Sequence, residues 1–257
     1  LVRNQTSDGC VSYRGIMQMY SHSVATLALC EAYGMTRDEK LKKAAESAVR
    51  FLERTQSNGG GWDYQAAISA PMRGPARNDL SISGWAVLAL KSAKAVGFSV
   101  SATVLDNLAD MYDRHSLESG ETYYADREYG ELPANRKGIG MVGVGLTSRV
   151  ILDQDRFHRR NAAAETLLLQ NKPEWRLFLE PNFGPANPNF NTFYGLYYGT
   201  LGVFLKARDL LMQDAGDGIH AAQMRVDVGT IDLRTDGDAV ITGIFTGNPT
   251  ESAILIT

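Results

Sequence analysis

The sequence has few of the residues that build metal sites or disulfide frameworks, and it lacks a strong charge of either sign. Among its 257 residues are two cysteines and four histidines, and the formal net charge is −3. Two cysteines make neither a disulfide scaffold nor a CxxC pair. Cys10 and Cys30 are expected to be free thiols, with a bridge between them as the alternative for an exported chain. No broad basic surface is available for nucleic acid or anionic lipid, and no metal or cofactor is expected.

Long apolar runs are also missing, so no transmembrane segment is expected, because none approaches the roughly 20 residues that cross a bilayer. The first residues, "LVRNQTSDGC", lack both a starting methionine and the layout of a signal peptide. We expect a piece of a longer chain, and the compartment is left open. Hydrophobic residues make up 44% of the chain, which is typical of a globular protein with a core. One domain is expected to span residues 1–257.

Amphipathic and apolar helices are predicted to alternate. Residues 36–54 place apolar side chains at three- and four-residue spacing, opposite lysines and glutamates. Thr36 and Glu39 fit a capping box at its start. Residues 23–34 and 80–97 are instead apolar nearly all round, and each ends in a glycine that can supply a left-handed cap. Helices without a polar face are buried on both sides, so the apolar set is predicted to lie inside the amphipathic set.

The helical pairs repeat with a period of about 50 to 60 residues, which indicates an array of helical hairpins. "NQTSDGCVSY" and "TQSNGGGWDY" precede the first two apolar helices. Further apolar helices are predicted at 138–152 and 189–205, and the outer partners at 36–54, 100–113, 156–170 and 206–224. The predicted fold is all-α, an α/α toroid of hairpins.

Two stretches carry turn signals. In "QSNGGGWDY" the glycines allow a sharp bend, Trp62 is predicted to plug the space between neighbouring hairpins, and Gln56 to bond exposed helix ends. Residues 231–245, "IDLRTDGDAVITGIF", alternate apolar and polar residues around an Asp-Gly turn. This pattern predicts a small β-hairpin near the C-terminus.

The glycine- and tryptophan-containing turns that lead into apolar helices are similar to the repeats of squalene–hopene cyclases and of protein prenyltransferase β subunits. The chain resembles most closely bacterial proteins, many from planctomycetes, that carry such repeats. The resemblance covers most of the chain and implies the toroid fold. It rests on five segments: "YSHSVATLALCEAYGMT", "GGGWDYQ", "NDLSISGWAVLALKSA", "GMVGVGLTSRVIL" and "FYGLYYGT".

The catalytic signatures of these relatives do not carry over. The string nearest to the Asp-x-Asp-Asp acid of the cyclases is "DQDR", residues 153–156, which ends in arginine and is interpreted as a surface turn. The prenyltransferases bind zinc through Asp, Cys and His, and no such set is present near Cys10 or Cys30. The "GCVSY" string also lacks the thioester motif of complement-like toroids.

Candidate site residues stand just before or inside the starts of the apolar helices, where the loops of a toroid converge on its mouth. A tyrosine-rich mouth with a few acids suits an apolar chain or a sugar. The candidates are His22, Asp63, Asp79, Tyr123, Tyr124, Arg136, Asn191, Tyr194 and Tyr198.

Three candidates have a structural interpretation beside the functional one. His22 is either a general base near neutral pH or a structural residue that caps its helix or hydrogen-bonds a neighbouring loop, and the structural role is favoured. Asp79 fits a helix N-cap, with a catalytic acid as the alternative. Asp63 either braces its loop or lines the mouth.

The missing signatures favour a recognition module that presents its mouth to a protein or a glycan. A cyclase-like enzyme or isoprenoid binder is the alternative, and a cavity lined by Trp85, Tyr194 and Tyr198 would support it. A polysaccharide lyase is a more distant alternative. It would need an arginine base and clustered acids, for which Arg136, Asp63 and Asp79 are the candidates.

Overall fold

The computed structural model describes residues 1–12, 17–66, 77–126, 138–152, 158–171, 192–214, 231–233 and 239–241. The chain forms two compact units, Leu1–Leu205 and Lys206–Thr257. Each is considered by itself, and the single domain expected over the whole chain stays a prediction. The described elements are a 3-10 turn at Val2–Asn4, α1 (Gln18–Thr36), α2 (Glu39–Arg54), α3 (Leu80–Ala95), α4 (Ala102–His115), α5 (Ile139–Ile151), α6 (Arg159–Gln170), α7 (Thr192–Asp214), β1 (Ile231–Leu233) and β2 (Ala239–Ile241).

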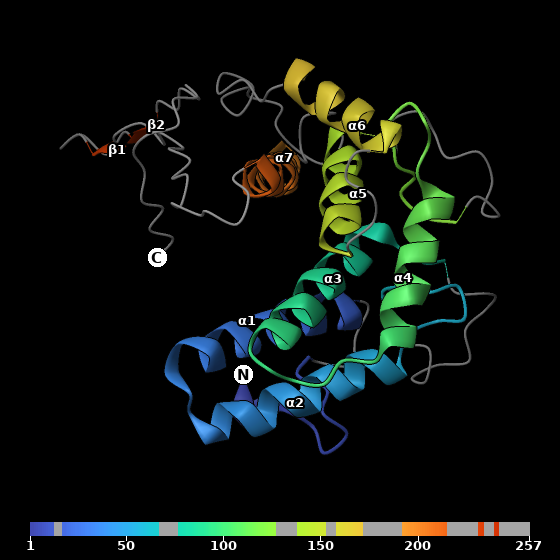
Figure 1. Ribbon diagram of the computed structural model, residues 1–257. Helices are drawn as coiled ribbons and strands as arrows, with labels where there is room; N and C mark the ends of the chain where they lie inside the picture. Colours follow the sequence, from blue (N-terminus) through green and yellow to red (C-terminus); the bar gives the residue numbers. More distant parts are fainter. Residues whose placement is uncertain are drawn as a thin grey trace. The chain divides into compact units, whose positions relative to one another are not determined.

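Within the first unit, the odd-numbered helices pack on one another and the even-numbered helices flank them (Figure 1). α1 packs on α3 and α3 on α5, while α2 contacts both α1 and α3, and α6 contacts α5. α7 lies against α5, where the hydroxyl of Thr147 donates to the backbone oxygen of Tyr198 at 2.7 Å. The predicted alternation of inner and outer helices is therefore confirmed for the described helices.

Burial explains this order. α3 and α5 bury nearly every residue, whereas α2 buries a single stripe of Ala44, Ala45, Ala48, Val49, Phe51 and Leu52. The polar face of α2 stays in water, as its lysines and glutamates require. Glycines let the inner helices approach closely: a Cβ on Gly143 would lie 2.7 Å from the backbone nitrogen of Gly199 in α7.

The sharp turns between outer and inner helices follow one design. Gly9, Gly60 and Gly120 all have φ near +90°, a conformation that other residues resist. The amide of Gln56 donates to the backbone oxygens of Gly60 and Val104, both at 2.9 Å, which ties the turn to α4. Gln5 ties the first turn to α2 in the same way. The predicted bond to the unpaired groups of a helix end is not what Gln56 makes, because its acceptors are a turn carbonyl and a carbonyl in the first turn of α4. Trp62 is 1% exposed, as expected of a plug.

In the third turn, which contains Gly120, Ser116 stands where the first two turns have glutamine. The side-chain contacts that the glutamine makes in those turns are replaced by contacts from an inner helix. Arg149 of α5 donates to the hydroxyl of Ser116, and its Nε donates to the side-chain oxygen of Asn161 in α6 at 2.6 Å. The guanidinium is 1% exposed, and burial lowers the pKa of Arg149 to about 10. A long side chain from the core thus replaces a clamp that the first two turns carry themselves.

Three local predictions were wrong. Thr36 is the last residue of α1 instead of the cap of α2, because Arg37 is left-handed at φ 56° and Asp38 caps α2 through the backbone N–H of Lys40 at 2.7 Å. Gly34 lies inside α1, whereas Gly97 is left-handed as predicted. The helices predicted at 189–205 and 206–224 form one helix, α7, as far as Asp214, because "FLKARDLL" holds no turn residue.

The second unit contains the predicted β-hairpin. β1 and β2 pair antiparallel, with Asp232 opposite Val240. The two strands flank the Asp-Gly sequence that predicted the turn. Among the described residues, the other β-type pairing is one isolated bridge between Ser116 and Thr122.

Candidate functional site

The candidate site lies at the N-terminal end of α3, where the segments that follow α2 and α4 meet. The backbone N–H of Leu80 donates to the carbonyl of Tyr124 at 2.9 Å, and that of Asp79 donates to the carbonyl of Trp62 at 2.7 Å. At the start of α1 the N–H of Met19 donates to the carbonyl of Tyr64 at 3.0 Å. These bonds use N–H groups that a helix leaves without an internal partner. They bring the side chains of Tyr64 and Tyr124, which are 60 residues apart in the sequence, to one place.

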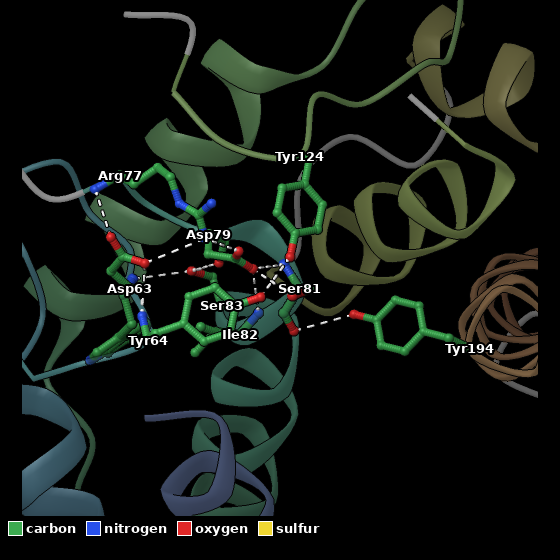
Figure 2. A network of polar contacts seen from close by, with 10 residues as sticks. Asp63, Tyr64, Arg77, Asp79, Ser81, Ile82, Ser83, Tyr124 and Tyr194 are labelled. Atoms are coloured by element: carbon green, nitrogen blue, oxygen red, sulfur yellow. Dashed lines mark hydrogen bonds and ion pairs between the residues drawn. The ribbon is translucent and has the colours of Figure 1, made fainter. Parts of the chain in front are cut away.

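Asp79 is the buried centre of the site, with no exposed surface (Figure 2). Its carboxylate accepts from the backbone N–H groups of Ser81 at 2.9 Å and Ile82 at 3.2 Å, and from the Ser81 hydroxyl. The predicted N-cap is therefore confirmed. Burial raises the pKa of Asp79, against the opposing effects of the Ser81 hydrogen bond and the charge of Arg77.

Arg77 joins the two acids of the site. Its Nη2 lies 2.7 Å from Oδ2 of Asp79 and 3.5 Å from Oδ1 of Asp63. The guanidinium also lies 5.2 Å from the ring centre of Tyr64 and 5.6 Å from that of Tyr124, which is cation–π geometry. Burial lowers the pKa of Arg77, but the charges of Asp79 and Asp63 outweigh it and the pKa is raised.

Tyrosine hydroxyls complete the network. The hydroxyls of Tyr64 and Tyr124 are 3.0 Å apart, and that of Tyr124 also bonds to Asp79. Because Asp79 only accepts, Tyr124 donates to it and Tyr64 donates to Tyr124. Burial and the charge of Asp79 raise the pKa of Tyr124. Tyr194 of α7 reaches the same end of α3, where it donates to the backbone oxygen of Ser81 at 3.2 Å.

A second acid–base pair adjoins this network. Nε2 of His115 lies 2.9 Å from Oδ1 of Asp126, and Nδ1 lies 2.7 Å from the carbonyl of Met111. Both ring nitrogens therefore face an oxygen atom. Asn78 donates to the other oxygen of Asp126, whose backbone N–H bonds to the carbonyl of Arg77.

Four of the sequence-predicted residues meet in this network: Asp63, Asp79, Tyr124 and Tyr194. Tyr123 is half-buried in the segment that carries Tyr124, with its backbone N–H on the carbonyl of His115. Arg136 and Asn191 lie outside the described residues. Sequence reasoning missed Arg77, His115 and Asp126.

His22 lies apart from the network, in the core. The backbone N–H of Val11 donates to its Nδ1 at 3.2 Å, so Nε2 carries the proton and bonds to the carbonyl of Ala48 at 3.1 Å. Its ring packs edge-on against Phe51, with ring centres 4.7 Å apart. The structural interpretation of His22 accounts for both ring nitrogens.

Tyr198 is also buried. Its ring lies 4.8 Å from that of Tyr194 and 5.4 Å from that of Trp85, which in turn stacks on Tyr197 at 5.4 Å. These aromatic side chains of α3 and α7 pack against one another.

No metal-binding group of three or more His, Cys, Asp or Glu side chains occurs in the described part of the chain. None of the helices there has both the length and the hydropathy of a membrane span. Cys10 and Cys30 are both free and buried, so the expected thiols are confirmed.

Comparison with known proteins adds one solved structure. No family model and no curated protein sequence matches the chain. The polysaccharide lyase BACCELL_00875 is structurally similar, with a TM-score of 0.57 at 12% identity, over 81% of this chain. The match spans 65% of that lyase. At this identity the likeness shows the fold alone. With the alternating helices, it confirms the predicted all-α, α/α-toroid class, while the tie to squalene cyclases stays a resemblance.

Proposed function

We propose that the protein is a recognition module that binds a glycan at the network around Arg77 and Asp79. The observation that carries this proposal is the pair of half-buried tyrosines, Tyr64 and Tyr124, whose ring centres lie 5.2 and 5.6 Å from one guanidinium. An aromatic body with a polar tip can contact the apolar face of a sugar and hydrogen-bond its hydroxyls. The fold likeness to a polysaccharide lyase supports a glycan over a protein as the partner.

Binding fits these residues better than catalysis does. A general base works best with a pKa near the operating pH, whereas the pKa of Tyr124 is raised by burial. Asp79 already accepts bonds from two backbone N–H groups, a hydroxyl and Arg77. Asp63, the other acid considered for a lyase, is half-buried and is held by Arg77 and by the backbone N–H of Tyr64. A lyase would therefore need a base that lies outside this network.

The alternative of an apolar ligand would use the aromatic side chains of α3 and α7. Tyr197 and Leu196 are 45% and 40% exposed, and both stand next to the buried Tyr198. However, the ring of Tyr198 packs against both Trp85 and Tyr194, so the side chains proposed to line an isoprenoid cavity are in contact with aromatic neighbours. This packing favours the glycan.

A hydroxyl-deletion series tests the proposal. The wild type is screened against oligosaccharides by isothermal titration calorimetry, and the best ligand is titrated into Tyr64→Phe and Tyr124→Phe. Each variant keeps the ring and loses hydrogen bonds, so we expect binding about tenfold weaker. Tyr33→Phe is the matched control, because Tyr33 stacks on Phe98 near the other end of α1, and it should bind like the wild type. Absence of binding to every glycan, or equal affinity in all three variants, would contradict the proposal.

A further inference from the structure

We infer that the glycan is uncharged and that the site rejects uronic acids. This inference rests on the proposed function and specifies its ligand class. Two observations support the inference. Arg77 already pairs with two carboxylates of the protein, and the hydrogen-bonding positions that remain for a ligand are acceptors.

Arg77, the arginine that the described part of the network contains, has both of its ion-pair partners within the protein. Arg77 contacts two carboxylates, Asp79 and Asp63, and its side chain is 23% exposed. Arg77 could bind a ligand carboxylate only by displacing one of them. Asp79 cannot leave without uncapping α3, and Asp63 is held by the backbone N–H groups of Tyr64 at 2.8 Å and Arg77 at 3.3 Å.

The surrounding charges also repel an acid. Among the described residues, the titratable groups of the network are Asp63 and Asp79 on Arg77, Asp126 paired with His115, and the hydroxyls of Tyr20, Tyr64 and Tyr124. Within the described residues, the carboxylates of Asp63, Asp79 and Asp126 outnumber the one guanidinium and the one imidazole that pair with them, so the network has no excess of positive charge. A ligand carboxylate placed a few ångströms away would be repelled in this partly buried setting.

The hydrogen-bonding positions that Asp63 and Tyr64 leave for a ligand are acceptors, and these suit the hydroxyl groups of a neutral sugar. A carboxylate has about four acceptor positions, and Asp63, which is 22% exposed, uses two on backbone N–H groups and shares its charge with Arg77. Tyr64 donates its proton to Tyr124 and hydrogen-bonds Arg77, so its hydroxyl oxygen, which has two lone pairs, keeps one acceptor position. Acceptors of this kind bind the O–H groups of a neutral sugar.

A matched pair of ligands tests the inference. A neutral glucan oligomer that binds the wild type is compared, by calorimetry at low salt, with the same oligomer oxidised at C6 to the carboxylate. We expect the neutral form to bind at least about tenfold tighter. The gap should narrow as salt is raised, because screening weakens the repulsion.

Two variants locate the cause. Asp63→Asn keeps the shape of the side chain, removes one negative charge and leaves Arg77 paired with Asp79 alone, so the preference for the neutral oligomer should fall several-fold. Asp106→Asn, on the exposed face of α4, is the control of equal net charge and should keep the wild-type preference.

The outcomes separate the two proposals. If the carboxylated oligomer binds as tightly as the neutral one, or more tightly, the inference is wrong while glycan recognition stands. The inference is also wrong if Asp63→Asn and Asp106→Asn behave alike. If neither oligomer nor any other glycan binds, the proposed function fails, and the ligand class fails with it.

Discussion

Replacing Trp62 by alanine is expected to lower the free energy of unfolding by about 4 kcal/mol. The side chain is 1% exposed, and its indole N–H donates to the backbone oxygen of Leu52 at 3.0 Å. Truncation would remove the largest fully buried side chain in the described part of the chain and leave that carbonyl without its donor. Urea unfolding of the variant and the wild type measures the loss.

Two further variants control this result. Trp62→Phe keeps most of the apolar volume and loses the N–H, so it should cost about half as much or less. Leu169→Ala removes a side chain that is 50% exposed and should cost under about 1 kcal/mol. A loss below about 1 kcal/mol for Trp62→Ala would show that the turn does not depend on its plug.

Stability is expected to fall steeply with acid because of His22. Burial lowers the pKa of His22 to about 4, from an ordinary value near 6.5 in the unfolded chain. Between these values the unfolded state binds the proton and the folded state does not. The stabilising contribution is therefore present above pH 6.5 and lost as the pH falls toward 4. The loss should reach about 3 kcal/mol.

Unfolding curves of the wild type and of His22→Gln, recorded from pH 7 to pH 4, test this result. Glutamine does not titrate, so the acid-dependent loss should be smaller in the variant by about the contribution of His22. Parallel pH profiles would show that other groups cause the acid sensitivity. The variant will be less stable at pH 7, and the difference in slope is therefore the quantity to compare.

The spacing of apolar residues predicted the helices well. The apolar stripe of α2 and the nearly all-apolar α3 and α5 each follow from which faces of the helix are buried, and that pattern runs along the whole segment. Their ends were less predictable, because they depend on single backbone conformations. Arg37 takes the left-handed conformation that the pattern assigned to Gly34, and this moves the start of α2 to the residue after Asp38. Gly34 instead lies inside α1, where a Cβ would come within 2.9 Å of a side-chain carbon of Val96.

The site was half predictable for a related reason. Asp63, Asp79, Tyr124 and Tyr194 were found because they stand beside predicted helix starts. Arg77 was missed because most of its partners, such as Asp63 and Tyr124, lie in other turns of the chain. One signal was available: a basic residue two positions before a buried N-cap acid stands where it can neutralise that acid. His115 and Asp126 also meet only through the fold.

The network at the start of α3 has two roles in this account, since it holds the helix in place and presents tyrosines and Asp63 to a glycan. A structural brace alone would need the first role only. Every charged group in the described part of the network has a partner within the protein. A purely structural brace would show the same pairing, so the two roles must be separated by experiment.

The location of ligand binding tests this account most directly, and hydrogen exchange followed by mass spectrometry measures it. With a saturating neutral oligosaccharide, exchange should slow in the segments 62–66, 77–82 and 122–126, while the exposed faces of α2 and α6 stay unchanged. Protection confined to other segments, or none with a ligand that calorimetry shows to bind, would place the site elsewhere and leave the network as a brace.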